Sequence, residues 1–195
     1  MTAADTPLPF ACVIPGAGDG TRFGQPKAEA EITPGERFID RVVRVAIASG
    51  ANPVLAVVRR GVRVNPPAVA VDGERTTDQL SSVRRGLARL AGTPARGVLL
   101  WPVDHPYVTL PAVLAIVDAF RATAALIVVP VYEGQRGHPI MFSRECWREL
   151  MTADGSDGAP EMMRRFESSV YEVAVSDREV LRDVNTRADL PGGEN

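Results

Sequence analysis

The residues VIPGAGDGTRFGQPK, numbered 13–27, carry the most information about the architecture of this chain. They continue an apolar, strand-like segment at 10–14 and place four glycines within nine residues, followed closely by Arg22 and Lys27. Glycines let backbone N–H groups turn toward an anion and approach it closely. Because fixed cations beside such a loop suit a polyphosphate, the stretch predicts a nucleoside triphosphate site near the N-terminus.

The loop differs from the two familiar glycine motifs of nucleotide-binding proteins. A dinucleotide-binding GxGxxG pattern would need glycine where the chain has Thr21 or Phe23, depending on the starting glycine. A P-loop would need lysine directly after Gly24, but Lys27 comes three residues later. A solvated glycine-rich turn is the alternative interpretation. The position of the loop after the first predicted strand favours the anion site.

Composition limits the other classes of function. The chain has 195 residues, 45% of them hydrophobic, a net charge of −2 and a pI near 5.8. We therefore expect one domain over residues 1–195, with no nucleic-acid partner and no membrane partner. The N-terminus lacks the pattern of a signal peptide, and Cys12 and Cys146 form no CxxC pair, which favours a cytoplasmic location.

Strand-like and helix-like segments alternate over the first 130 residues. This alternation predicts an α/β fold, a three-layer α/β/α Rossmann-like sandwich with a mostly parallel sheet. After residue 131 the rhythm is irregular, and we expect an antiparallel strand at 139–142, two short helices and a last strand. The expected strands are 10–14, 53–58, 69–71, 97–101, 126–131 and 170–175, and the expected helices are 37–49, 77–91 and 111–123.

Ligands of open parallel sheets bind at the carboxyl ends of the strands. The glycine loop follows the first expected strand, and three further polar segments follow later ones. We expect all four to converge on one crevice. The three further segments are 102–106, 132–138 and 183–186.

A magnesium site is predicted at this edge of the sheet. Asp104 lies in a stiff turn between two prolines, and a carboxylate held at a strand end is a suitable Mg²⁺ ligand. Asp183 and Asn185 are two residues apart and would share a face on an extended chain, so either could supply a second oxygen, with Asn185 favoured. The alternative for both segments is a polar turn that caps a neighbouring helix.

The two histidines, His105 and His138, both fall in predicted strand-end loops. Without cysteines or a close group of carboxylates they make a poor zinc site. We expect His105 to be structural, and His138 to lie beside Arg136 where a substrate phosphate could dock.

Polar residues begin the second predicted helix. Gln79, Ser81 and Ser82 could contact a ribose, a base or a phosphate at the helix N-terminus. A solvated helix face with capping groups is the alternative.

Five stretches together resemble the MobA-like nucleotidyltransferases, above all their molybdenum-cofactor cytidylyltransferase branch. The family pattern LAAGxGxRxGxPK corresponds to PGAGDGTRFGQPK at 15–27. The resemblance covers residues 10–190 with the motifs in order. The other four are S-[LV]-x-x-G-L at 82–87, P-x-D-x-P at 102–106, G-x-R-G-H-P at 134–139 and D-x-[DN]-T-x-x-D-L at 183–190.

The resemblance implies a nucleotide-diphospho-sugar transferase type of fold and a role for each motif. Arg22, Lys27 and Asp104 would be catalytic, and Asp104 with Asn185 or Asp183 would bind Mg²⁺. The implied acceptor-binding residues are Arg136, Gly137 and His138. The implied nucleotide-binding residues are Gly16, Ala17, Gly18, Gly20, Thr21, Arg22, Gly24, Lys27, Gln79, Ser81 and Ser82.

The function implied is Mg²⁺-dependent transfer of a nucleotidyl group, CMP in the first instance, to a phosphate-bearing acceptor such as molybdopterin cofactor, with release of pyrophosphate. Ala17 before Gly18 resembles the cytidylyl branch of the family more than the guanylyl branch, which implies CTP rather than GTP. A transient protein partner would receive the product. Two alternatives stay open: a sugar or alcohol phosphate as acceptor, and a nucleotide-binding module without turnover, which Glu29 and Glu31 close to Lys27 would suit.

Overall fold

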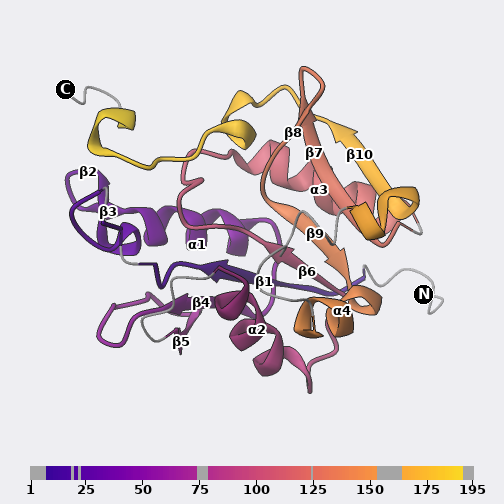
Figure 1. Cartoon of the computed structure of the whole chain (residues 1–195), viewed down its shortest axis with the longest axis horizontal. Helices are drawn as coiled ribbons and strands as arrows, with labels where there is room; N and C mark the ends of the chain where they lie inside the picture. The colour runs from indigo at the N-terminus through magenta and orange to yellow at the C-terminus, as the bar shows by residue number, and fades with distance from the viewer. Residues whose placement is uncertain are drawn as a thin grey trace.

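The computed structural model describes residues 8–18, 20–21, 23–73, 79–123, 125–152 and 164–190. Within these residues a central sheet runs in the order β10-β7-β9-β6-β1-β4-β5, with β8 paired to β7 (Figure 1). Its strands are β1 (Phe10–Pro15), β4 (Val54–Val58), β5 (Val69–Asp72), β6 (Gly97–Leu100), β7 (Ile127–Tyr132), β8 (Gln135–Arg136), β9 (Ile140–Ser143) and β10 (Val170–Ala174).

Most strands of this sheet point the same way. β1 pairs in parallel with β4 and β6, β4 with β5, and β7 with β10. β9 is antiparallel to both β6 and β7, so β7 and β10 keep the direction of the first four strands. The carboxyl ends of these six strands therefore lie along one edge, where the loops after them meet.

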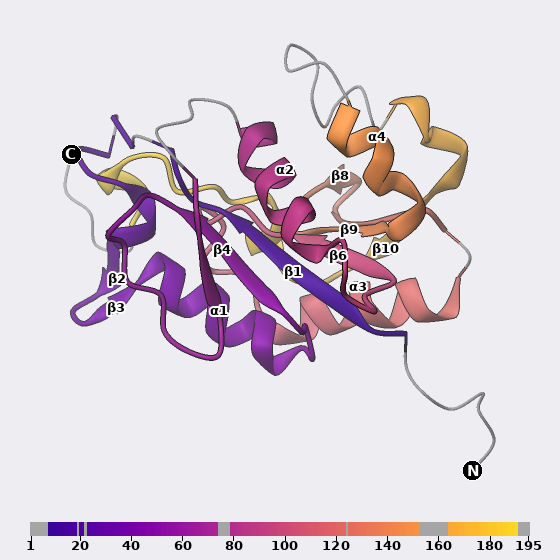
Figure 2. The same ribbon diagram turned by 90° about the horizontal axis from the view of Figure 1, so that it is seen from below.

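Helices cover both faces of the sheet. α1 (Phe38–Ala48) and α3 (Leu110–Ala122) lie on one face, and α2 (Gln79–Leu90) and α4 (Trp147–Thr152) lie on the other (Figure 2). Each long helix turns an apolar stripe to the sheet; in α2 the stripe includes Val83, Leu87 and Leu90. The strands between them are continuously apolar because both of their faces are buried.

The predicted three-layer α/β architecture is confirmed, and the element bounds agree closely. The strand expected at 139–142 is β9, and it is antiparallel as expected. The helix expected from residue 77 begins at Gln79 within the described part; residues 77 and 78 lie outside it. The sequence did not predict β8 or the hairpin of β2 (Glu31–Thr33) and β3 (Glu36–Arg37), because pieces of two or three mostly polar residues carry no periodic signal.

After β10 the chain crosses the carboxyl edge of the sheet as an extended segment, residues 177–190, which we call the strap. It contains the short 3₁₀ turns η4 (Arg178–Leu181) and η5 (Arg187–Asp189). Backbone hydrogen bonds tie it to two strand-end loops: His138 N donates to Val180 O at 2.8 Å, and Val184 N donates to Asp104 O at 2.8 Å. Further 3₁₀ turns are η1 (Lys27–Glu29), η2 (Arg144–Cys146) and η3 (Glu167–Ser169).

None of the helices among the described residues has the length and apolar character needed to cross a membrane.

Candidate active site

Three side chains from distant parts of the sequence meet at the carboxyl edge of the sheet. Lys27 Nζ donates to Asp104 Oδ2 at 2.9 Å and to Asn185 Oδ1 at 2.6 Å. The Lys27 and Asp104 side chains are 18% and 28% exposed, so the pair is shielded from bulk water but still reachable. The glycine loop, the turn after β6 and the strap therefore converge, as the strand-end rule predicts.

The turn that carries Asp104 is rigid. Trp101 is fully buried, and its Nε1 donates to the backbone oxygen of His105 at 3.0 Å. His105 N donates to Pro102 O, and Val103 N donates to Pro15 O at the end of β1, both at 3.1 Å. These bonds hold the carboxylate beside the glycine loop without help from a ligand.

Asn185 and Asp183, the two candidates for a second metal oxygen, lie side by side. Asn185 Nδ2 donates to Asp183 Oδ2, which leaves Asn185 Oδ1 to accept from Lys27. Of the two, Asn185 contacts Lys27.

This set of oxygens has the chemistry of a site for a hard divalent cation. It offers carboxylate oxygens from Asp104 and Asp183 and an amide oxygen from Asn185, and two of these groups already hold the Lys27 ammonium. Mg²⁺ binds through one or two carboxylates completed by water and substrate phosphates. Among the described residues no group of three or more His, Cys, Asp or Glu side chains is placed to hold a metal ion.

The glycine loop is shaped by its backbone. Gly16 N donates to Val57 O at 2.9 Å, and Phe23 N and Gly24 N both donate to Gly20 O. Gly20 has φ +58°, and a Cβ there would stand 1.9 Å from the Gln25 carbonyl oxygen, so only glycine fits. The loop thus closes on itself just before Lys27.

The predicted loop residues differ in exposure. Gly16 and Ala17 are buried, and Gly18, Thr21 and Gly24 are exposed. Arg22 lies outside the described residues. Arg59, at the end of β4, donates from Nε to Ala17 O at 3.2 Å and so touches the loop. Sequence reasoning missed Arg59, although its place directly after a strand was the signal that would have found it.

The two histidines form a buried pair behind Asp104. Their ring centroids are 4.8 Å apart, and neither Nδ1 atom has a hydrogen-bond partner among the described residues. Burial, together with a smaller contribution from the neighbouring His105, lowers the pKa of His138 to about 4. Burial also lowers the pKa of His105, against the opposing effect of Asp104. Both rings are therefore neutral near pH 7.

The residues predicted to contact the acceptor are directed toward different neighbours. Arg136 donates from Nε to Glu172 at 2.7 Å and from both terminal nitrogens to Glu167, so its guanidinium faces carboxylates at the β10 side of the sheet. The backbone of Gly137 and His138 lies against the strap instead: a Cβ on Gly137 would stand 2.4 Å from Val180 O, and His138 N donates to the same oxygen.

At the start of α2, Gln79 is exposed, Ser81 is half-buried and Ser82 is buried at 3% exposure. Ser82 therefore faces the protein interior.

Asp189 lies in the family motif at 183–190, but no role was predicted for it from the sequence. It accepts hydrogen bonds from the backbone of Asn185 and Thr186, and the Thr-x-x-Asp spacing of a capping box was the available signal.

Comparison with known proteins places these features in a family. Residues 12–170 match the family described as "MobA-like NTP transferase domain". A 2-C-methyl-D-erythritol 4-phosphate cytidylyltransferase of Deinococcus radiodurans is 34% identical over 160 residues, which are 80% of this chain and 64% of that protein. The chain thus spans less than two thirds of that relative. A probable molybdenum cofactor guanylyltransferase of Mycobacterium marinum is 28% identical over 185 residues, 93% of this chain and 92% of that protein.

Solved structures show the same architecture. The crystal structure of Rv0371c from Mycobacterium tuberculosis matches with a TM-score of 0.80 and 26% identity, over 93% of this chain and 95% of that one. A crystal structure of Rv0371c in complex with manganese matches with a TM-score of 0.76, at the same identity and coverage.

Proposed function

Because the chain belongs to the MobA-like NTP transferase family, we propose that it transfers a nucleotidyl group from a nucleoside triphosphate to a phosphate-bearing acceptor. The observation that carries this proposal is the Lys27 ammonium held by Asp104 and Asn185 at the end of the glycine loop. The mixed, mostly parallel sheet with helices on both faces is the nucleotide-diphospho-sugar transferase fold, as predicted.

The chemistry requires alignment and charge neutralisation more than a strong base. An oxygen of the acceptor phosphate, already ionised at neutral pH, attacks the α-phosphorus and forms a new P–O bond. The bond from the α-phosphorus to the bridging oxygen breaks, and pyrophosphate leaves with that electron pair. The loop N–H groups, Arg22 and Lys27 would stabilise the charge that develops on the pyrophosphate.

Lys27 is suited to this role by its remaining hydrogen-bonding capacity. An ammonium has three N–H donors, and within the described residues Asp104 and Asn185 accept two hydrogen bonds from it. The third donor can reach a phosphate oxygen while the side chain stays fixed. Pre-orientation of this kind reduces the reorganisation needed when charge moves in the reaction.

Asp104, with Asn185 or Asp183, would hold a divalent cation, for which we propose Mg²⁺. Bound there, the cation would polarise phosphate oxygens and offset their negative charge. The manganese complex of Rv0371c supports a divalent cation in this fold.

We propose CTP as the donor and a phosphate-bearing pterin such as molybdopterin cofactor as the acceptor. Ala17 in the loop and the cytidylyltransferase relative support CTP. GTP is the second candidate, because the guanylyltransferase relative matches over nearly the full length of both chains. A sugar or alcohol phosphate is the second candidate acceptor.

The exposure of Glu29 and Glu31 supports an active enzyme rather than an inactive nucleotide-binding module. Both side chains are exposed, and they alternate with Ala28, Ala30 and Ile32, which are buried. The two carboxylates thus lie on the solvent side of this segment.

A two-step experiment tests the proposal. Thermal shift with each of the four triphosphates and MgCl₂ should give the largest increase in Tm with CTP, because a ligand that binds only the folded state stabilises it by mass action. Pyrophosphate release is then measured with that nucleotide and a panel of pterin, sugar and alcohol phosphates. Binding of a nucleotide without pyrophosphate release under any acceptor would contradict the proposed activity.

A further inference from the structure

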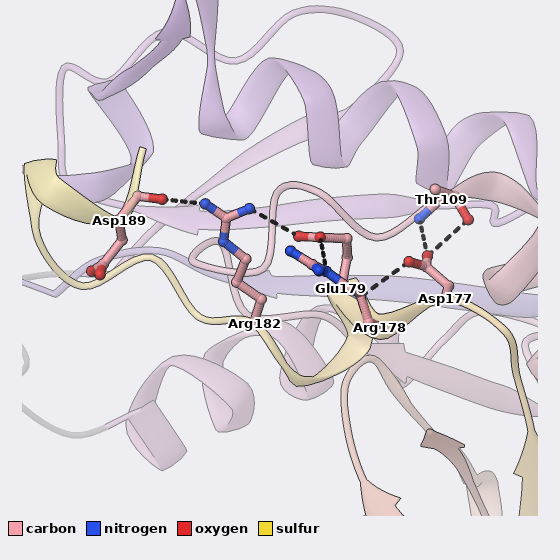
Figure 3. Close-up of polar contacts among 6 residues, drawn as sticks. All are labelled: Thr109, Asp177, Arg178, Glu179, Arg182 and Asp189. Atoms are coloured by element: carbon pink, nitrogen blue, oxygen red, sulfur yellow. Dashed lines mark hydrogen bonds and ion pairs between the residues drawn. The ribbon is translucent and has the colours of Figure 1, made fainter. Parts of the chain in front are cut away.

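Within the described residues, the strap is held at each end by an aspartate carboxylate that accepts three hydrogen bonds; Figure 3 shows those of Asp177. At its start, Asp177 accepts from Thr109 N and Thr109 Oγ1, both at 2.8 Å, and from Glu179 N at 3.0 Å. At its end, Asp189 accepts from Asn185 N at 2.9 Å, Thr186 N at 2.7 Å and Thr186 Oγ1 at 3.0 Å. The two carboxylates accept equal numbers of these hydrogen bonds, but they hold different segments of the chain in place.

Asp177 joins the strap to the N-terminus of α3. The three hydrogen bonds that it accepts come from Thr109 and Glu179, and not from the cluster of Lys27, Asp104 and Asn185. Asp189 instead fixes the backbone of Asn185 and of the residue after it. Since all three of its bonds converge on one oxygen, Oδ2, they close a tight turn around residues 185–189.

Arg182 supports this turn from outside. It donates to the backbone oxygen of Asp189 and to Glu179 Oε2, the latter at 3.3 Å (Figure 3). Its guanidinium also lies over the Tyr107 ring, 4.7 Å from the centroid. The turn around Asp189 is therefore tied to the loop that follows the Asp104 turn.

The backbone on the other side of Asn185 is fixed as well. Val184 is fully buried, and its N–H donates to the carbonyl oxygen of Asp104 itself at 2.8 Å. Asn185 is thus held between an anchor on Asp104 and an anchor on Asp189. With both anchors in place, its side chain is positioned to bridge Lys27 and Asp183.

We propose that Asp189 is a positioning residue for the active site: it holds Asn185 Oδ1 in the Lys27–Asp104 cluster without itself touching a ligand. The geometric part of this inference stands on the hydrogen bonds alone. Its consequence for cation and nucleotide binding rests on the proposed function. Removing a group that orients a metal ligand typically weakens metal binding about 10- to 100-fold.

The test compares Asp189→Ala, Asp189→Asn and Asp177→Ala in the full chain. Asp189→Asn keeps an oxygen acceptor without the charge, whereas Asp177→Ala is the matched control because it also removes three hydrogen bonds from the strap. Mn²⁺ binding is measured by calorimetry with the metal alone. Amide hydrogen exchange of Asn185 and Thr186 is measured by NMR, and Tm by thermal denaturation.

We expect Asp189→Ala to weaken Mn²⁺ binding about 10- to 100-fold and to speed exchange at both amides, with Asp189→Asn intermediate. Asp177→Ala should lower Tm while changing Mn²⁺ affinity less than about twofold. Equal weakening of Mn²⁺ binding by both alanine variants would overturn the inference, because it would show a general effect of the strap. Unchanged exchange at Asn185 and Thr186 in Asp189→Ala would also overturn it.

The exchange measurement separates this inference from the proposed function. If the wild-type chain binds no Mn²⁺ and no nucleotide, the proposed function fails, and amide exchange alone decides whether Asp189 holds Asn185. If Asp189→Ala does not fold, Asp189→Asn and Asp177→Asn are compared instead. Both keep an oxygen acceptor and should therefore lose less stability.

Discussion

The two halves of the sheet are built differently. The N-terminal half, β1, β4, β5 and β6, is wholly parallel, and three of its strands, β1, β4 and β6, are buried at every position. The C-terminal half, β7, β9 and β10 with the strap, mixes directions, and β10 is partly exposed along its length. The two meet where β6 pairs with β9 and where His105 packs against His138.

The candidate site needs both halves, and each contributes in its own way. The N-terminal half supplies Lys27 and Asp104, whose positions follow from where buried strands end. The C-terminal half supplies Asn185, whose position depends on individual polar contacts of the strap. The ends of buried strands thus place one side of the site, where hydrogen bonds then hold the Asp104 turn, and polar contacts of the strap position Asn185 on the other.

The largest effect is expected from breaking the N-terminal contribution. Asp104→Asn keeps the size of the side chain but removes the charge that holds Lys27 and would hold a cation. We expect pyrophosphate release to fall about 10²- to 10³-fold, the usual cost of removing one preorganised electrostatic contact. The measurement is steady-state kinetics with the nucleotide selected by thermal shift.

Asp118→Asn serves as the control for this variant. Asp118 lies on α3 with a side chain that is 75% exposed, and its one ion pair among the described residues is a 4.0 Å contact with Arg121. It should keep wild-type turnover and Tm. Wild-type turnover in Asp104→Asn would show that the Asp104 carboxylate is not needed for the reaction.

The same difference between the halves explains what the sequence could predict. Continuous apolar runs such as the one at β1 mark buried parallel strands, and the strand-end rule then brings Lys27 and Asp104 together. The ion pairs of Arg136 with Glu167 and Glu172 form only because β10 lies beside β7. The spacing of residues along the chain does not show which strands are neighbours. The place of Arg136 in a polar loop therefore did not indicate Glu167 and Glu172 as its partners.

The histidine pair at the junction predicts an acid-sensitive stability. Burial, with a smaller contribution from His105, lowers the pKa of His138 from 6.5 to about 4. Between these values the unfolded chain binds a proton that the folded chain does not, so stability decreases as pH falls from about 6.5 toward 4. The loss from His138 amounts to roughly 2–3 kcal/mol.

Urea denaturation at pH 7, 5.5 and 4.5 measures this loss, with His138→Gln as the comparison. The variant should show a shallower decrease over this range, though not a flat one, because burial also lowers the pKa of His105. Glu36, whose pKa is lowered to about 2 by hydrogen bonds from Arg41 and Arg44, loses its contribution only at lower pH. Equal slopes in the two proteins would show that His138 is not buried as a neutral ring.

A smaller effect is expected from two close-packed glycines, one in each half. On Gly86 of α2 a Cβ would stand 2.5 Å from Val13 Cγ1 in β1, and on Gly137 a Cβ would stand 2.4 Å from the Val180 carbonyl oxygen in the strap. Alanine at either position should cost about 1–3 kcal/mol by overpacking, measured by urea denaturation.

The two alanine variants should differ in what else they change. Gly86→Ala strains a side-chain contact inside the N-terminal half, so the folded protein should keep its Mn²⁺ affinity. Gly137→Ala pushes on the backbone of the strap, next to the bond from His138 N to Val180 O, and should weaken Mn²⁺ binding along with stability. If both variants lost stability and kept full affinity, the strap would not transmit strain to Asn185, and the hydrogen bonds of the C-terminal half would stabilise the fold without setting the geometry of the site.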